Sequence, residues 1–181
     1  MRRFGDWMQT ATGKAFWPLD PRPEEVDIVD IASALSKICR YGGHCERFYS
    51  VAEHSVHVAY AVAPQLRLKA LLHDAPEAYL GDVIRPLKRF LINYDKYEQR
   101  VADAIATHFG LDNLSDLSIK EADGNIILDE HDQAMRRGPA WTNPEWGVGR
   151  EPLGVDLEFW KPDVAKERFT EAFLDFGGVM S

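Results

Sequence analysis

The run ALLHDAPEAYLGD, residues 70 to 82, places ionisable side chains inside a segment of small and apolar residues. The side chains in question belong to His73, Asp74, Glu77 and Asp82. Burial of a carboxylate is costly unless another group pairs with it. A chain that keeps these acids within a core therefore needs a compensating cation, and a bound metal ion is one such partner.

Most of the remaining sequence indicates helices, so the expected fold class is all-α. Ile28, Ile31 and Leu35 recur at helical spacing, and Ser50 with Glu53 has the order of a capping box before a second helix that ends at Pro64. A second capping-box pattern occurs at Ser118 and Glu121. Further helices are expected over residues 65–75, 94–110, 116–136 and 162–176, with a short turn opened by Pro86.

A length of 181 residues favours one domain over residues 1–181. We expect a helical core over 27–136 and an irregular lead-in over 1–26, which is rich in glycine and proline. The segment 138–178 is expected to hold a long ordered loop near 138–160 and the last helix. The predicted architecture is a bundle of about six or seven helices with no convincing strand pair.

The composition limits the possible partners. The formal charge is −8 and Lys and Arg form no block, which argues against binding of duplex nucleic acid. No uncharged apolar stretch approaches the ~20 residues that span a membrane. Cys39 and Cys45 form no CxxC pair, so we expect free thiols and a cytoplasmic protein. A small anionic ligand remains compatible with this composition.

One set of residues has the chemistry of a metal site. It combines two imidazoles with two carboxylates, from His54, His73, Asp74 and Asp123. Such a set suits one divalent transition ion, namely Mn, Co, Fe, Ni or Zn, and leaves positions for water and a substrate oxygen. A single histidine on a helix is more often structural, so spacing alone leaves this hypothesis open.

The order of three segments adds a resemblance. SVAEHS, LLHDAPEAYLGD and KEAD follow the H…HD…D signature, and the chain resembles the HD-domain metal-dependent phosphohydrolases over about residues 27–136. It is most similar to the YfbR-like branch, which includes 5′-deoxynucleotidases and the phage dATP triphosphohydrolases called DatZ. The resemblance implies a single all-helical HD domain and the metal ligands His54, His73, Asp74 and Asp123.

The resemblance also implies roles for residues around that ion. Glu77 would lie beside the scissile phosphate, and Asp82 would handle the proton of the attacking water. Arg40 would hold phosphate, with Lys88 as a second candidate. Pro86 resembles a residue that lines the base pocket, and Tyr41 follows the arginine at the substrate side.

Each of these residues also has a structural interpretation. Glu77 could be an exposed residue after a helix, and Asp82 a turn residue after Gly81. Arg40 could complement a helix dipole, and Lys88 could be solvated. His57 is expected to be structural, because the order E-H-S-V-H does not match the zinc-protease motif H-E-x-x-H.

The sequence therefore predicts an enzyme that hydrolyses small nucleotides with one divalent metal ion. A 5′-deoxynucleotidase that releases phosphate from deoxynucleoside monophosphates ranks first. A triphosphohydrolase that releases tripolyphosphate from dATP is the alternative, because two glycines follow Tyr41 where the phage enzymes carry bulky side chains. A di-iron HD oxygenase and a non-catalytic nucleotide-binding protein are the rivals from other classes, and a homodimer is left open.

Overall fold

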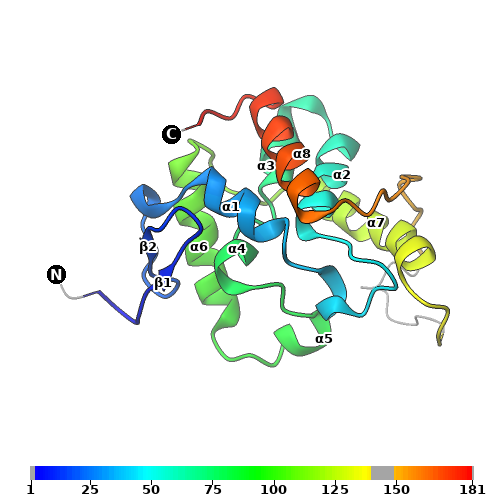
Figure 1. Ribbon diagram of the computed structural model, residues 1–181, viewed down its shortest axis with the longest axis horizontal. Coiled ribbons are helices and arrows are strands. Elements are labelled where there is room, and N and C mark those ends of the chain that lie inside the picture. Colours follow the sequence, from blue (N-terminus) through cyan, green and yellow to red (C-terminus); the bar gives the residue numbers. More distant parts are fainter. Residues whose placement is uncertain (1–2, 140–148, 181) are drawn as a thin grey trace.

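The computed structural model describes residues 3–139 and 149–180, which form a mostly helical protein (Figure 1). The described part holds eight α-helices, one or two more than expected, because two of them are single turns that sequence periodicity does not reveal. They are α1 (Ile28–Leu35), α2 (Val51–Ala61), α3 (Arg67–Leu71), α4 (Glu77–Leu80), α5 (Arg85–Lys88), α6 (Tyr94–His108), α7 (Leu117–Ala134) and α8 (Pro162–Asp175).

The expectation that no strands pair is wrong in one place. Within the lead-in, β1 (Met8–Gln9) pairs antiparallel with β2 (Ala15–Phe16). Each strand is only two residues long, so there is no alternating pattern for sequence analysis to detect. The Phe16 side chain is fully buried and stacks on Tyr79 with ring centroids 3.7 Å apart, which attaches the hairpin to the helical core.

Helix boundaries confirm some capping predictions and contradict others. The Ser50 side chain accepts a hydrogen bond from the Glu53 backbone N–H at 3.1 Å, as the capping box predicts. At α7 the predicted cap is wrong, because Asp116 accepts from the Ser118 N–H at 2.8 Å and is itself the N-cap. Asp116 lies one residue before the helix, so its carboxylate reaches the first free N–H groups and Ser118 is already inside the helix.

The continuous helix predicted over residues 65–75 is also wrong. The chain forms a 3-10 turn at Pro64–Leu66, then α3, and then leaves the helix at Leu72. The residues from Leu72 to Pro76 are turns before α4 begins at Glu77. His73 and Asp74 therefore lie in a turn between two short helices.

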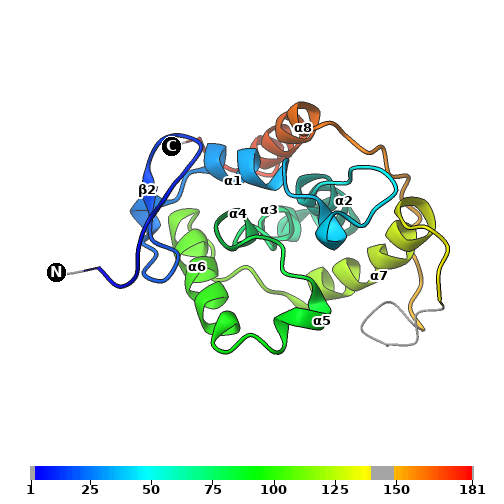
Figure 2. The same ribbon diagram turned by 60° about the horizontal axis from the view of Figure 1, so that its bottom comes forward.

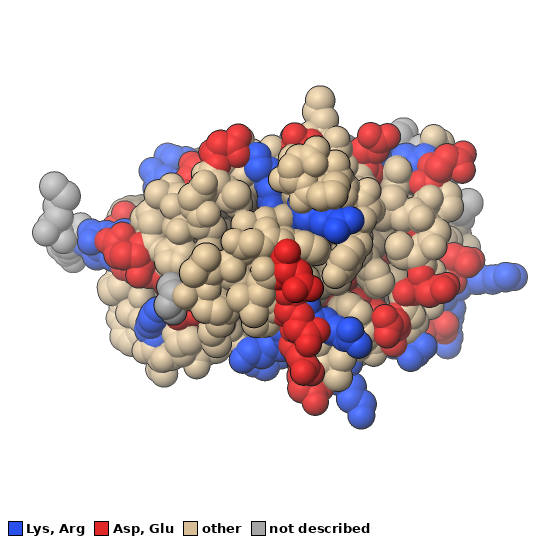
Figure 3. Space-filling model, turned by 90° about the horizontal axis from the view of Figure 1, so that it is seen from above, with Lys and Arg blue, Asp and Glu red and all other residues tan. Residues whose placement is uncertain are grey.

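The core lies where α2 packs against α3, α7 and α8, while α1 packs against α4 and α8. Figures 1 and 2 show α6 and α7 on opposite sides of the molecule, with α5 between them at one edge. No helix in the described ranges has the length and apolar character needed to cross a membrane. On the face seen in Figure 3, Lys and Arg side chains are interspersed with Asp and Glu.

Residues 151–161 form no regular structure and are called the strap below. They belong to the loop expected near 138–160, and the part of that loop at 140–148 lies outside the described residues. Two buried carboxylates hold the strap. Glu53 on α2 accepts from the backbone N–H groups of residues 158–160, and Asp129 on α7 accepts from those of residues 153–155. The strap is thereby attached to both helices.

Candidate metal centre and adjoining cavity

His54 projects from α2 and is fully buried. Its Nδ1 lies 2.7 Å from a carboxylate oxygen of Glu130, which is also fully buried. An ionised carboxylate only accepts hydrogen bonds, so the ring proton belongs on Nδ1 and the lone pair on Nε2. This carboxylate–imidazole pairing is the arrangement that orients histidines which bind metal ions.

His73 lies in the turn after α3 and shows the same arrangement with a different partner. Its Nδ1 is 2.7 Å from the Ala70 carbonyl oxygen, so this nitrogen donates, and in the neutral ring the lone pair is again on Nε2. The two imidazole centroids are 5.4 Å apart. Both Nε2 atoms are buried, and neither makes a hydrogen bond to any described residue. Seven other buried side-chain atoms of the described residues also have no hydrogen bond, among them His57 Nε2 and Trp160 Nε1, so this property alone does not identify a ligand site.

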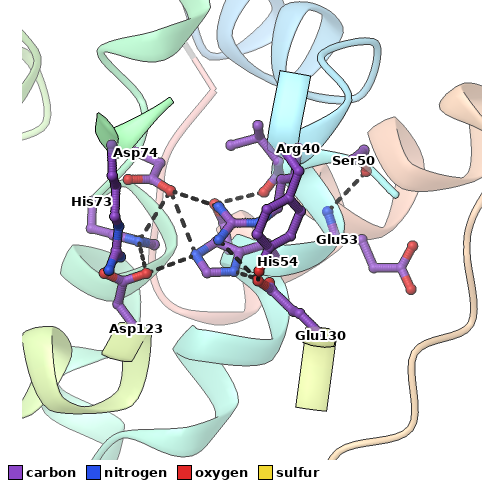
Figure 4. Close-up of polar contacts among 12 residues, drawn as sticks. Arg40, Ser50, Glu53, His54, His73, Asp74, Asp123 and Glu130 are labelled. Carbon is purple, nitrogen blue, oxygen red and sulfur yellow. Dashed lines mark hydrogen bonds and ion pairs between the residues drawn. The ribbon is translucent and has the colours of Figure 1, made fainter. Parts of the chain in front are cut away.

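Two carboxylates approach these nitrogens. Asp74 Oδ2 is 3.5 Å from His54 Nε2 and 3.3 Å from His73 Nε2. Asp123 Oδ1, from α7, is 3.3 Å and 4.0 Å from the same two atoms. Figure 4 shows His54 between these carboxylates on one side and Glu130 on the other. The structure thus brings together the predicted set from α2, the turn after α3, and α7.

One ligand atom from each of His54, His73 and Asp123 lies within 4.8 Å of the others, so these residues could hold a metal ion. The donor set of imidazole nitrogen and carboxylate oxygen fits a divalent transition ion. The two unpartnered Nε2 atoms are the observation that supports this fit, because a cation would satisfy both at once. The identity of the metal does not follow from the donor set.

The electrostatics of the cluster favour positive charge. Burial alone would lower the pKa of His73, but the carboxylates of Asp74 and Asp123 outweigh burial and raise this pKa to about 9. Burial raises the pKa of Asp74, yet His73 and His54 bring it below its usual range. The same competition, with Arg85 as an additional cation, lowers the pKa of Asp123. The carboxylates therefore draw a cation, either a proton or a metal ion, to the imidazoles.

Glu130 joins this cluster to the side chains that precede α2. One of its oxygens pairs with His54, and the other accepts from an Arg40 guanidinium nitrogen at 3.1 Å and from the Tyr41 hydroxyl. Arg40 also lies 3.7 Å from Asp74 Oδ2. Burial raises the pKa of Glu130, but Arg40 and His54 outweigh it and lower the pKa to about 2. Glu130 is therefore an ionised carboxylate inside the protein.

A cavity of about 380 Å³ opens beside the cluster. Its lining includes the carboxylates Asp74 and Asp123 together with all six predicted catalytic and substrate-binding residues, Arg40, Tyr41, Glu77, Asp82, Pro86 and Lys88. The other lining residues are His44, Val83, Ile84, Arg85, Ile127 and Met135. The cavity thus combines apolar side chains with three cations, Arg40, Arg85 and Lys88, and with four carboxylates.

The two predicted catalytic acids differ from ordinary surface carboxylates. Burial raises the pKa of Glu77, and the charges of Asp74 and Asp82 raise it further. Glu77 Oε2 is buried and makes no hydrogen bond to a described residue. Burial also raises the pKa of Asp82, although Arg40 opposes that shift. Glu77 is the first residue of α4 and is partly buried, so it does not match the alternative of an exposed residue after a helix. Asp82 is partly buried but does follow Gly81 in irregular chain, so its alternative as a turn residue stays open.

The cationic side chains are all paired. Arg85 donates to Asp123 Oδ2 at 3.0 Å, and Lys88 Nζ lies 2.6 Å from Glu98. Lys88 is thus not simply solvated. A second cavity of about 340 Å³ is lined by His73 and also touches Asp74, Glu77 and Asp123. Its lining adds the carboxylates of Asp95, Glu98 and Asp116 and a single cation, Lys120, so it is more acidic than the first cavity, which has three cations.

Sequence reasoning missed two residues of this network. Glu130 follows Asp123 by seven residues, which is two helical turns, so the shared face of α7 was a signal that could have found it. Arg85 stands three residues before Lys88, which was the candidate for contact with an anion. His57 lies outside the cluster and stacks on Trp160 with centroids 5.8 Å apart.

Comparison with known proteins identifies two relatives of this chain, and both are described as uncharacterized. The chain is 36% identical over 136 residues to the uncharacterized protein YfdR of Escherichia coli K12, covering 75% of this chain and 76% of YfdR. This chain belongs to the YfdR family. An uncharacterized protein of Rhodobacter capsulatus, RCAP_rcc00048, is also 36% identical, over 126 residues and 64% of each chain. No family model matches the sequence.

Proposed function

We propose that this member of the YfdR family is an HD-domain metal-dependent phosphohydrolase that acts on small nucleotides. Its first-ranked activity is that of a 5′-deoxynucleotidase, which releases phosphate from deoxynucleoside monophosphates. One observation carries the proposal. Two buried imidazole Nε2 atoms without hydrogen-bond partners converge with two carboxylates at the edge of a cavity lined by Arg40, Arg85 and Lys88.

His54, His73, Asp74 and Asp123 would hold the ion in this proposal. A divalent ion in such a site lowers the pKa of water and neutralises charge on phosphoryl oxygens. The protein's contribution is to fix these donors. Glu130 and the Ala70 carbonyl hold the imidazoles with Nε2 facing the carboxylates, so little reorganisation is needed when the ion enters.

The remaining polar residues of the cavity have roles toward the substrate. Glu77 and Asp82 line the cavity, and whichever of them is ionised would accept a proton from an attacking water. Arg40 presents a planar guanidinium that can hold two phosphate oxygens, and Arg85 and Lys88 add positive charge. The apolar wall formed by Ile84, Pro86, Ile127 and Met135 suits a nucleoside base.

The triphosphohydrolase activity remains the second candidate because three cationic side chains line one cavity. A monophosphate needs fewer cations than a triphosphate, whose charge is spread over a longer chain. The two activities give different products. A monophosphatase releases inorganic phosphate, whereas the alternative reaction releases tripolyphosphate and a nucleoside.

The test is product release from a panel of ribo- and deoxynucleotides. The purified protein is first treated with a chelator and then given Mn²⁺, Co²⁺, Fe²⁺, Ni²⁺ or Zn²⁺ one at a time. We expect phosphate from deoxynucleoside monophosphates with at least one metal, and no turnover without metal. Tripolyphosphate from dATP alone would replace the first-ranked activity by the second. Metal and nucleotide binding without any product would contradict both activities and favour a binding protein.

A further inference from the structure

Glu130 is a fully buried carboxylate whose partners are all side chains. Each of its two oxygens contacts different partners. Oε1 faces Nδ1 of His54, and Oε2 accepts from Arg40 and Tyr41. One oxygen thus contacts a metal-ligand candidate, and the other contacts two residues that line the cavity.

We propose that Glu130 is a positioning residue that links the metal centre to the anion-binding wall of the cavity. Through Oε1 it keeps the proton of His54 on Nδ1, which leaves Nε2 free to bind a cation. Through Oε2 it holds the Arg40 guanidinium and the Tyr41 ring at the cavity wall. The role toward substrate rests on the proposed function, whereas the role toward the metal does not.

The chemistry of the contacts requires a carboxylate at this position. His54 Nδ1, Arg40 and Tyr41 all donate, so both oxygens must accept. A glutamine has the same shape but offers one accepting oxygen and one NH₂ group. The amide oxygen can face only one side. Arg40 and Tyr41 supply two donors, one of them charged, so we expect the oxygen to stay with them and the NH₂ group to face His54 Nδ1, which then loses its acceptor.

Tyr41 supports this role from the backbone. Its φ is 57°, in the left-handed region that side chains other than glycine seldom adopt. Such strain persists only where the surrounding contacts hold the residue in place. The hydroxyl contact with Glu130 is one such contact, and it sets the ring where it lines the cavity.

The adjacent residue provides a matched control. Asp129 is also a buried carboxylate on α7, but it accepts from backbone N–H groups of the strap. Glu130→Gln and Asp129→Asn therefore make the same chemical change one residue apart. A general effect of neutralising a buried acid would appear in both variants, and an effect on the metal centre only in the first.

The experiment measures the affinity for Zn²⁺ or Co²⁺ by competition with a chelator, with no substrate present. We expect Glu130→Gln to weaken metal binding by about 10- to 100-fold, the usual effect of losing a partner behind a metal-binding histidine. Asp129→Asn should bind metal within about twofold of the wild type. Equal affinity of Glu130→Gln and the wild type, or equal losses in both variants, would overturn the proposal.

Two further measurements keep the proposal testable if Glu130→Gln does not fold. Imidazole ¹⁵N NMR of the metal-free wild type at high pH should show His54 with its proton on Nδ1, and a proton on Nε2 would overturn the proposal. Tyr41→Phe removes only a partner of Oε2, so it should raise the KM for the nucleotide with metal affinity unchanged. A loss of metal affinity in Tyr41→Phe would overturn the division between the two oxygens.

The failure of this inference and the failure of the proposed function are distinguishable. A wild-type protein that hydrolyses no nucleotide but loses metal affinity on Glu130→Gln would contradict the function and support the metal role of Glu130. A wild-type protein that hydrolyses nucleotides, but whose metal affinity is unaffected by Glu130→Gln, would support the function and contradict the metal role of Glu130.

Discussion

The candidate metal centre and the strap are each served by one residue of two neighbouring pairs, one pair on α2 and one on α7. On α2, Glu53 holds the strap and His54 enters the centre, and on α7, Asp129 holds the strap and Glu130 enters the centre. Successive residues on a helix point about 100° apart, so one helix can serve both regions. The strap and the centre thus lie on adjoining faces of the same two helices.

The strap carboxylates, His54 and Glu130 are all buried, whereas His73, Asp74 and Asp123 are partly buried, and the two regions also differ in their partners. The hydrogen bonds of the strap carboxylates come from backbone N–H groups, and the His57 ring lies 3.7 Å from Glu53 without a hydrogen bond. In the centre the partners are side chains, and two imidazole nitrogens have no hydrogen bond to the described residues. Burial alone therefore does not identify functional residues. The candidate centre differs in that its two imidazole nitrogens face carboxylates from two other parts of the chain, a group that could hold a metal ion.

The largest expected effect comes from removing an imidazole of the centre. His73→Gln deletes one of the proposed metal ligands, so metal affinity should fall by more than about 100-fold, beyond the loss caused by disturbing a residue behind a ligand. Chelator competition and metal analysis of the purified variant measure this.

His57→Gln is the matched control for that variant, because His57 packs on Trp160 at the strap side of α2. It should retain the bound metal. Loss of metal in His57→Gln, or its retention in His73→Gln, would break the distinction between the two faces of α2.

The second largest expected effect is a loss of stability when an anchor of the strap is changed. Glu53→Gln replaces a carboxylate that accepts three backbone N–H groups with an amide whose NH₂ faces some of them. We expect the free energy of unfolding to fall by about 2 kcal/mol, as measured by urea denaturation. Metal affinity should change by less than about twofold. A variant with unchanged stability and weakened metal binding would show that Glu53 acts in the candidate metal centre and does not anchor the strap.

The smallest effect tests a buried carboxylate outside both regions. Asp27 caps α1 through the Val29 N–H and pairs with Lys14, and these contacts outweigh burial and lower its pKa. A lowered pKa means that the folded state favours the ionised form. Its stabilisation is present above the usual aspartate range and is lost as the pH falls through the lowered value.

Asp27→Ala should therefore cost about 1 kcal/mol at pH 7, and the difference from the wild type should shrink in acid. Urea denaturation at several pH values measures both quantities. Metal affinity should be unaffected. A stability difference that grows as the pH falls would contradict the assigned cap and ion pair.

The sequence predicts the long helices well because their signals are local. The spacing of Ile28, Ile31 and Leu35 and the cap at Ser50 are properties of a few consecutive residues, and both match the structure. The predictions fail where the chain changes direction within a few residues. The break after Leu71 and the two-residue strands depend on tertiary packing, which no periodic pattern records.

The centre was predicted only in part for a similar reason. His54, His73, Asp74 and Asp123 could be selected because their side chains have metal-ligand chemistry, and the structure brings them together. Glu130 binds no substrate or metal in this account, so only its place two turns after Asp123 marks it in the sequence. Its importance arises from contacts with Arg40 and His54, which lie 90 and 76 residues away along the chain.

X-ray absorption spectroscopy of the zinc-loaded protein tests the central claim most directly. The account predicts one ion per chain, with two imidazole nitrogens at about 2.0–2.1 Å and carboxylate oxygens as further ligands. It also predicts that His54→Gln leaves a single imidazole or no bound ion. A spectrum without imidazole scattering, or an unchanged spectrum in that variant, would show that His54 and His73 do not share a cation.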